Sequence, residues 1–136
     1  MKLEIGQFVR TKDGIIAKVD YIDDNTIFFD KDLYRTYSDG INFLEKDNLE
    51  RIVKVSYSII DILEVGDYLN GFKVSKIERY DTNTIIKIGN STFNVLEGEK
   101  IYTPSYDNNN GYEKIEKLKS IVTKEQMEQM EYKVGE

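Results

Sequence analysis

The sequence predicts a mainly β fold with a short C-terminal helix, organised as two tandem copies of one small β-barrel module. Two observations predict it: an internal repeat, and Asp-Gly and Asn-Gly dipeptides placed between short apolar runs. The chain has 136 residues, which suits one ordinary domain or two very small ones. We place the two modules at residues 1–57 and 58–136.

The repeat is clearest near the start of each copy. Residues 3–9, Leu-Glu-Ile-Gly-Gln-Phe-Val, correspond to residues 63–69, Leu-Glu-Val-Gly-Asp-Tyr-Leu, with three identities. The matches then continue in the same order: residues 18–20 with 76–78, 25–27 with 83–85, and 49–53 with 118–122. Two copies are too few for a solenoid, so the repeat favours two modules packed together or an oligomer.

Each copy is predicted to contain short strands joined by tight turns. Asp13-Gly14 and Asn70-Gly71 each predict a type I′ hairpin, because both central residues of that turn have φ > 0. Asp30-Lys31-Asp32 and Gly89-Asn90-Ser91 are predicted as equivalent middle turns. The predicted strands are residues 7–11, 15–22, 26–30, 33–37 and 49–55, then 67–70, 72–80, 84–88, 92–96, 100–103 and 118–122.

The segment between the copies and the C-terminal tail have patterns of their own. Residues 57–63 are mostly apolar and lack Gly and Pro, which predicts a packed connection rather than a flexible linker. Thr123 and Gln126 have the spacing of a capping box and predict a helix start, with Met127 and Met130 on one face. Residues 132–134 are predicted to return as a strand.

The composition excludes several classes of site. The chain has no Cys and no His, which rules out disulfides, thiol nucleophiles, Ser-His-Asp triads and the common zinc sites. A formal net charge of −6 argues against direct nucleic-acid binding. No apolar run approaches the roughly 20 residues that cross a bilayer, and the N-terminus lacks a signal-peptide pattern. We therefore expect a cytoplasmic, non-enzymatic protein with no cofactor and no membrane partner.

The opening of each copy resembles a known barrel type. In the first copy, Gly6-Gln7-Phe8-Val9 is followed by the turn residue Gly14 and by a strand containing Lys18-Val19. This pattern resembles the start of SH3-like, KOW-type and Tudor-type barrels. The resemblance implies that each copy closes as a small SH3-like barrel.

A second resemblance concerns the later part of the chain, roughly residues 49–136. Residues 59–71 (IIDILEVGDYLNG), 119–126 (KSIVTKEQ) and 132–136 (YKVGE) together resemble small uncharacterised accessory proteins of phages and prophages of low-GC Gram-positive bacteria. That family has no catalytic residues to transfer. The resemblance implies a setting, because small acidic phage proteins of this kind often neutralise host defences.

Aromatic and arginine side chains supply the candidate ligand contacts. Tyr and Arg are typical of binding hot spots, and a phosphate-bearing ligand would use one or more of the few arginines. The alternative interpretation of the aromatic segment is a strand rich in residues that favour β structure. The candidate ligand-binding residues are Arg10, Tyr34, Arg35, Tyr37, Arg79 and Tyr106.

No metal site is predicted. Asp30-Lys31-Asp32 has a spacing that can hold Mg²⁺, but the same residues are favoured in a hairpin turn. Residues 107–113 begin like a calcium loop, but their sixth residue is Tyr112 where an EF-hand loop needs Gly.

Three hypotheses for function remain open. The first is a phage accessory protein that sequesters a nucleotide-derived host immune signal as a homo-oligomer in the host cytoplasm. The second is an acidic inhibitor that covers a basic surface of a host defence protein. The net charge of −6 suggests this hypothesis. The third is a structural or adaptor protein of the phage particle.

Overall fold

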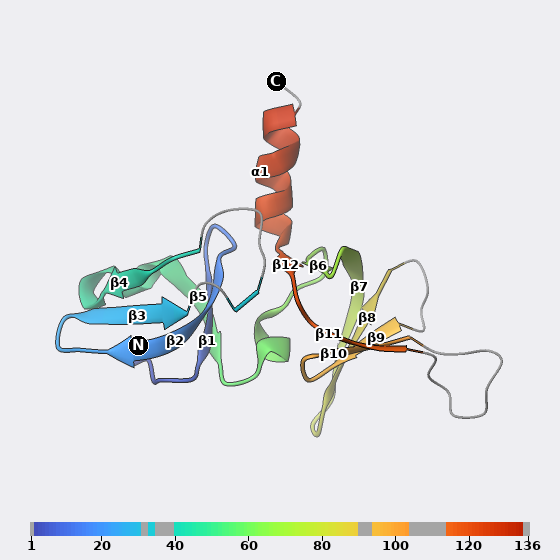
Figure 1. Ribbon diagram of the computed structural model, residues 1–136, viewed down its shortest axis with the longest axis horizontal. Coiled ribbons are helices and arrows are strands. Elements are labelled where there is room, and N and C mark those ends of the chain that lie inside the picture. The colour runs from blue at the N-terminus through green and yellow to red at the C-terminus, as the bar shows by residue number, and fades with distance from the viewer. Residues whose placement is uncertain (1, 31–32, 35–39, 90–93, 104–113, 135–136) are drawn as a thin grey trace.

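The computed structural model describes residues 2–30, 33–34, 40–89, 94–103 and 114–134. Two curled antiparallel sheets lie side by side, and one helix projects away from both (Figure 1). The mainly β fold with a C-terminal helix is therefore confirmed. None of the described helices is both long enough and apolar enough to cross a membrane.

The first sheet has five strands in the order β4-β3-β2-β1-β5. A 3₁₀ helix at Lys46–Arg51 connects β4 to β5. The strands are β1 (Phe8–Thr11), β2 (Ile16–Ile22), β3 (Thr26–Asp30), β4 (Phe43–Glu45) and β5 (Ile52–Ser56).

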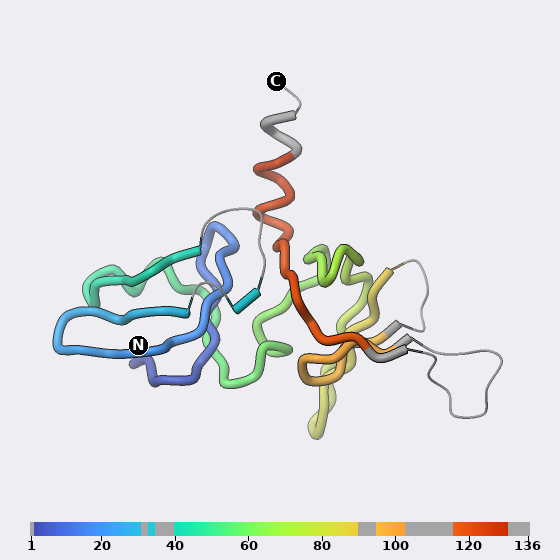
Figure 2. The backbone as a smooth tube through the Cα atoms, viewed as in Figure 1, coloured from blue at the N-terminus to red at the C-terminus, as the bar shows by residue number. Residues whose placement is uncertain are grey.

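The second sheet has seven strands in the order β11-β10-β9-β8-β7-β6-β12, and the chain then enters helix α1 at Lys124–Val134 (Figure 2). The strands are β6 (Tyr68–Leu69), β7 (Phe72–Arg79), β8 (Thr84–Ile88), β9 (Asn94–Glu97), β10 (Lys100–Thr103), β11 (Lys114–Lys117) and β12 (Ile121–Val122).

The two sheets repeat one topology. The order β12-β6-β7-β8-β9 reproduces β5-β1-β2-β3-β4, and β10 with β11 extends the second sheet. The opening turns also match, because Gly6 and Gly66 have φ values of +95° and +99°. Gly6 N donates to Val19 O at 2.9 Å, and Gly66 N donates to Val74 O at 3.0 Å. Equivalent turns therefore start equivalent sheets.

The register between the copies differs from the one that the sequence predicted. Lys18 faces Phe8 across the first hairpin, and Lys73 faces Tyr68 across the second. Both long strands also have a bulge directly after Val19 and Val74. Residues 18–20 therefore correspond to residues 73–75 and not to residues 76–78. The tight two-residue turn of the second copy shortens its first hairpin and lengthens the next one.

Several predicted elements need correction. Leu33 and Tyr34 form a bend rather than a strand, and the fourth strand of the first sheet is Phe43–Glu45. Residues 132–134 belong to helix α1 instead of a returning strand, and β11 was not predicted.

The two predicted type I′ turns also differ from each other. Asn70 and Gly71 both have positive φ, at 49° and 87°, which confirms the type I′ turn in the second copy. In the first copy only Gly14 has a positive φ, at 86°, because the loop has three residues and not two. The predicted type I′ turn at Asp13-Gly14 is therefore wrong.

The apolar core has two parts, one of which joins the copies. One cluster lies inside the first sheet and includes Val9, Val19 and Ile27. The other joins Phe8 of β1 to Leu69 and other residues of the second sheet. The connection supplies its centre through Ile59, Ile60, Ile62 and Leu63, all buried, so the prediction of a packed connection is confirmed.

Candidate functional site

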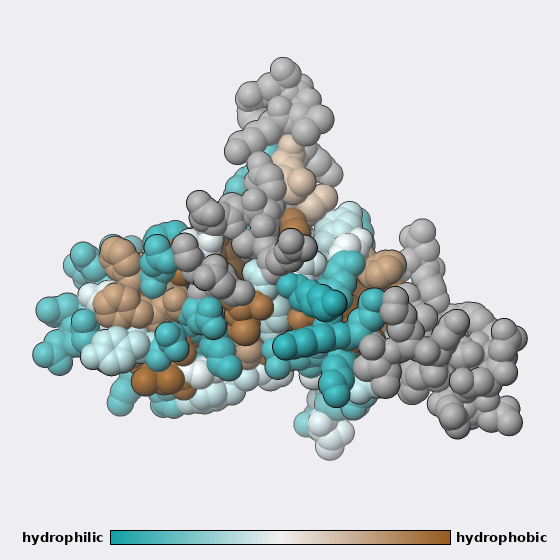
Figure 3. Space-filling model, viewed as in Figure 1, coloured by the Kyte–Doolittle hydropathy of each residue, from teal (hydrophilic) through white to brown (hydrophobic). Residues whose placement is uncertain are grey.

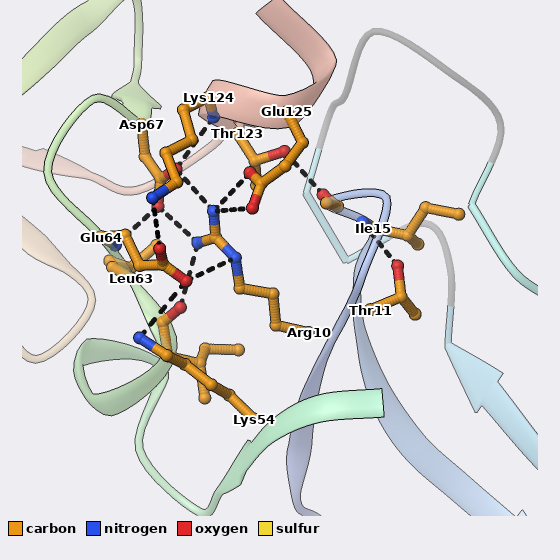
Figure 4. A network of polar contacts seen from close by, with 12 residues as sticks. Arg10, Thr11, Ile15, Lys54, Leu63, Glu64, Asp67, Thr123, Lys124 and Glu125 are labelled. Carbon is orange, nitrogen blue, oxygen red and sulfur yellow. Dashed lines mark hydrogen bonds and ion pairs between the residues drawn. The ribbon is translucent and has the colours of Figure 1, made fainter. Parts of the chain in front are cut away.

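Arg10, one of the predicted ligand contacts, lies between the two sheets instead of at the surface (Figure 4). Its side chain is 0% exposed. Nη1 donates to Asp67 Oδ2 at 2.6 Å and to the Ile62 carbonyl at 3.0 Å, and Nη2 donates to Asp67 Oδ1 at 2.9 Å. Nη2 also donates to both carboxylate oxygens of Glu125, at 2.7 and 3.1 Å. The guanidinium thus joins β1, the connection, the second sheet and helix α1.

The remaining nitrogen of this guanidinium faces a third carboxylate. Arg10 Nε lies 3.2 Å from Glu64 Oε2 without an aligned hydrogen bond. Glu64 also pairs with Lys54 at 3.3 Å and with Lys124 at 2.6 Å. Burial by itself would raise the pKa of Glu64, but the hydrogen bond from Lys124 and the charge of Arg10 outweigh it, so this pKa is lowered. In this network the negative charge of the carboxylates is therefore balanced by the positive charge of Arg10, Lys54 and Lys124.

Asp67 is the most constrained carboxylate of the network. It is 0% exposed and accepts the forked pair of hydrogen bonds from Arg10. It also accepts backbone N–H groups from Glu64 at 2.7 Å and from Lys124 at 3.0 Å. The backbone donors fix the opening turn of the second copy and the first residue of α1 in the same place.

The start of α1 is held against the first sheet. Thr123 N donates to Gln126 Oε1 at 3.1 Å and Gln126 N to Thr123 Oγ1 at 3.4 Å, which confirms the predicted capping box. Thr123 Oγ1 donates in turn to the Gly14 carbonyl at 2.8 Å. A Cβ added to Gly14 would lie 2.2 Å from that hydroxyl. The hairpin turn of the first copy therefore touches the helix start directly.

Tyr34 is buried as well, although the sequence predicted it as a ligand contact. Its ring stacks on Phe8 at a centroid distance of 6.4 Å, and its hydroxyl donates to Glu99 in the β9–β10 turn of the second module. Burial, with the hydrogen bond to Glu99 as the second cause, raises the pKa of Tyr34. Its described contacts hold the two sheets together.

Arg79 is the one candidate arginine that the structure shows at the surface, with its side chain 45% exposed. Its Nη1 lies 3.9 Å from Asp61 Oδ1, and Nη2 donates to the Leu63 carbonyl at 3.4 Å. Both contacts turn it toward the connection.

Next to Arg79 is an open groove of about 460 Å³, which we name the acidic groove. It lies between the connection, the tip of the β7–β8 hairpin and the β9–β10 turn. Its wall carries the carboxylates of Asp61, Asp81 and Glu97, the exposed ring of Tyr80, and neutral polar groups such as Thr82. No Lys or Arg is among its lining residues. Its charge suits a cationic group and opposes a phosphate.

The other candidate residues cannot be placed. Arg35, Tyr37 and Tyr106 lie outside the described residues, as do most of the Asp30-Lys31-Asp32 turn and all of residues 107–113. Within the described residues, no group of three or more acidic side chains is arranged to hold a metal ion.

The carboxylates around Arg10 were missed by the sequence analysis, although one signal pointed to them. Asp67 stands where the first copy has Gln7, so the second copy carries a charge at the repeated turn position. Thr123 and Gln126 were assigned correctly, but nothing local indicates that Glu125, between them, reaches Arg10.

Comparison with family models, curated proteins and solved structures found no match to this chain.

Proposed function

We propose that this chain is a non-enzymatic binding protein that blocks another protein by offering a carboxylate-lined surface to a basic region of it. The acidic groove carries the proposal, because it combines a concave shape, three carboxylates and an exposed tyrosine ring. A lysine or arginine side chain of a partner would find both opposite charge and an aromatic wall there.

The described residues give less support to a nucleotide ligand. Arg10 has its donors directed at carboxylates and a carbonyl inside the molecule. Arg79 lies beside the acidic groove and is paired with Asp61, one of the three carboxylates that line it. A phosphate there would meet repulsion at short range. Sequestration of a nucleotide signal thus depends on Arg35, Tyr37 and Tyr106, which lie outside the described residues.

The proposed setting is counter-defence in a phage-infected cell, which rests on the family resemblance of residues 49–136. Many defence proteins act on nucleic acids and present basic grooves, because phosphate binding needs cationic surface. An acidic protein with a net charge of −6 is suited to cover such a groove. Homo-oligomer formation remains a prediction.

The test measures capture of a basic protein from a lysate of a low-GC Gram-positive bacterium by the immobilised chain. Two variants are compared: Asp81→Asn with Glu97→Gln in the acidic groove, and Asp24→Asn with Glu50→Gln on exposed positions of the first module. Both variants remove the same charge. Two surface ion pairs are worth about 0.5–1 kcal/mol each, so we expect the groove variant to weaken the captured complex about five- to thirtyfold.

Two results would overturn the proposal. One is equal weakening by both variants, because the groove would then contribute only bulk charge. The other is a rise in melting temperature with a nucleotide from a panel of cyclic and linear nucleotides, combined with intact recovery of that nucleotide. A complex held by the groove should also weaken between about 0.1 and 1 M salt, since the screening length falls from about 10 Å to 3 Å.

A further inference from the structure

Three aromatic side chains form a continuous row across the first sheet, which we name the aromatic row. Tyr21 of β2 faces Phe28 of β3, and Phe28 faces Phe43 of β4. The ring centroids are 5.7 Å apart in the first pair and 6.3 Å apart in the second. Tyr21 is 57% exposed and Phe43 is 54% exposed. Figure 3 shows apolar side chains gathered over this end of the sheet with hydrophilic ones around them.

The aromatic row lies on the face of the sheet that the second module uses further along. On β1, Phe8 and Arg10 point to that face, since Phe8 joins the core cluster of the second module and Arg10 bonds Asp67. Phe8 pairs with Lys18 on β2, and Lys18 pairs with Asp30 on β3, so all three lie on this face. Phe28 is two residues from Asp30 on β3 and therefore lies on the same face. One end of this face is covered by the second module, at Phe8 and Arg10, and the other end, at the aromatic row, is exposed.

Two exposed carboxylates flank the aromatic row, whereas Lys18, the cation on the same face, lies over the Phe8 ring at the filled end. Glu45 is exposed one strand pair beyond Phe43, opposite Thr26. The exposed Asp20 occupies the bulge before Tyr21. Residues two apart on a strand are separated by about 7 Å, so a cation over the row would lie within reach of these carboxylates. Lysine already uses this face in one place, because Lys18 Nζ lies 5.3 Å from the centre of the Phe8 ring.

We propose that the aromatic row is a second docking surface, which receives arginine side chains from a basic segment of a protein partner. A guanidinium stacks on an aromatic ring and keeps its edge free for a carboxylate, and lysine cannot do both in that geometry. Apolar area alone would suit many partners, but the two flanking carboxylates select a cationic one. The proposal concerns the first module and needs no residue of the acidic groove.

The test uses hexa-arginine and hexalysine peptides with the full chain, followed by amide and aromatic NMR shifts at low salt. We expect hexa-arginine to bind several times more tightly than hexalysine, with the largest shifts in β2, β3 and β4. Tyr21→Ala with Phe43→Ala should weaken hexa-arginine binding about fivefold or more, since each lost cation–π contact is of measurable strength. The matched control is Phe72→Ala, a 44% exposed aromatic of the second sheet, which should change binding less than about twofold.

Three outcomes would overturn the proposal. They are equal binding of the two peptides, peptide shifts that avoid β2 to β4, and a wild-type dimer that the Tyr21/Phe43 variant separates, because a second copy would then occupy the row. Glu45→Gln removes one carboxylate of the surroundings without touching a ring, so it should weaken binding even if the ring variant fails to fold. The groove variant Asp81→Asn with Glu97→Gln should leave the shifts in β2 to β4 in place, which separates a failure here from a failure of the proposed function.

Discussion

Replacing Arg10 with Met should destabilise the whole molecule, because one guanidinium joins parts of the chain that are far apart in sequence. Its partners Asp67 and Glu125 lie 57 and 115 residues away. Met has similar length and no charge, so the substitution removes the donors with little change in volume. Glu64 and Glu125 can turn toward water, since they are 23% and 24% exposed, but Asp67 is 0% exposed and would lose its buried cationic partner.

Removing one partner of a buried ion pair costs about 3–5 kcal/mol, chiefly through the charge that is left behind. We therefore expect Arg10→Met to lower the free energy of unfolding by about 3–5 kcal/mol and the melting temperature by roughly 10–20 °C. Arg10→Lys should fall between the variant and the wild type, because an ammonium keeps the charge but cannot make the forked pair with Asp67.

The assay is urea unfolding followed by circular dichroism, with the Asp67→Gln variant completing a double-mutant cycle. Gln is the residue at the same turn of the first copy, where Gln7 Oε1 accepts the Glu4 N–H at 2.8 Å. It can therefore keep the turn while removing the charge. We expect a coupling free energy of about 2–3 kcal/mol between the two substitutions. Additive effects, or a loss below about 1 kcal/mol for Arg10→Met, would refute the reasoning.

Three further predictions use the same denaturation assay. Gly14→Ala should destabilise by about 1–3 kcal/mol more than Gly71→Ala, because both glycines have positive φ but only at Gly14 would a Cβ meet Thr123, at 2.2 Å; equal losses would contradict the close contact. Thr123→Ala should cost about 1–2 kcal/mol through the lost cap, with reduced helix signal as a second readout. The lowered pKa of Glu64 means that its contribution is present above its ordinary value of 4.5 and is lost as pH falls through the lowered pKa. Stability should therefore drop in that acidic range, and Glu64→Gln should make the drop shallower.

Three local signals in the sequence predicted the local structure correctly, although the type I′ turn at Asp13-Gly14 and the strand at 132–134 were wrong. The Asn70-Gly71 turn, the capping box of Thr123 and Gln126, and the packed connection all depend on residues within a few positions of one another. Such features depend on backbone φ values and short-range hydrogen bonds, which residue type largely determines.

Long-range partners could not be predicted in the same way. Arg10 was assigned to a ligand because arginine is scarce here, yet its guanidinium is bound by carboxylates that come from distant parts of the chain. Tyr34 was assigned to a strand on its β propensity, but the bend buries its ring on Phe8 instead. At Tyr34 tertiary contacts outweighed a local β preference, and at Arg10 the partners are too distant in sequence for a local pattern to indicate them.

The ion network also shows where the two similar modules differ at matching positions. In the first copy the turn is held by Gln7, and in the second by Asp67, which accepts the Glu64 N–H at 2.7 Å in the same manner. Three residues later the matching positions are Arg10 and Asn70, and Asn70 bonds the Lys117 carbonyl within its own module at 2.9 Å. Of the pair Gln7 and Asp67, only Asp67 is charged, and of the pair Arg10 and Asn70, only Arg10 is charged. These two charged residues bind each other across the two modules. Two identical modules would place Arg opposite Gln or Asn opposite Asp at this contact, so the ion pair exists only because the copies differ, and that difference fixes how they dock.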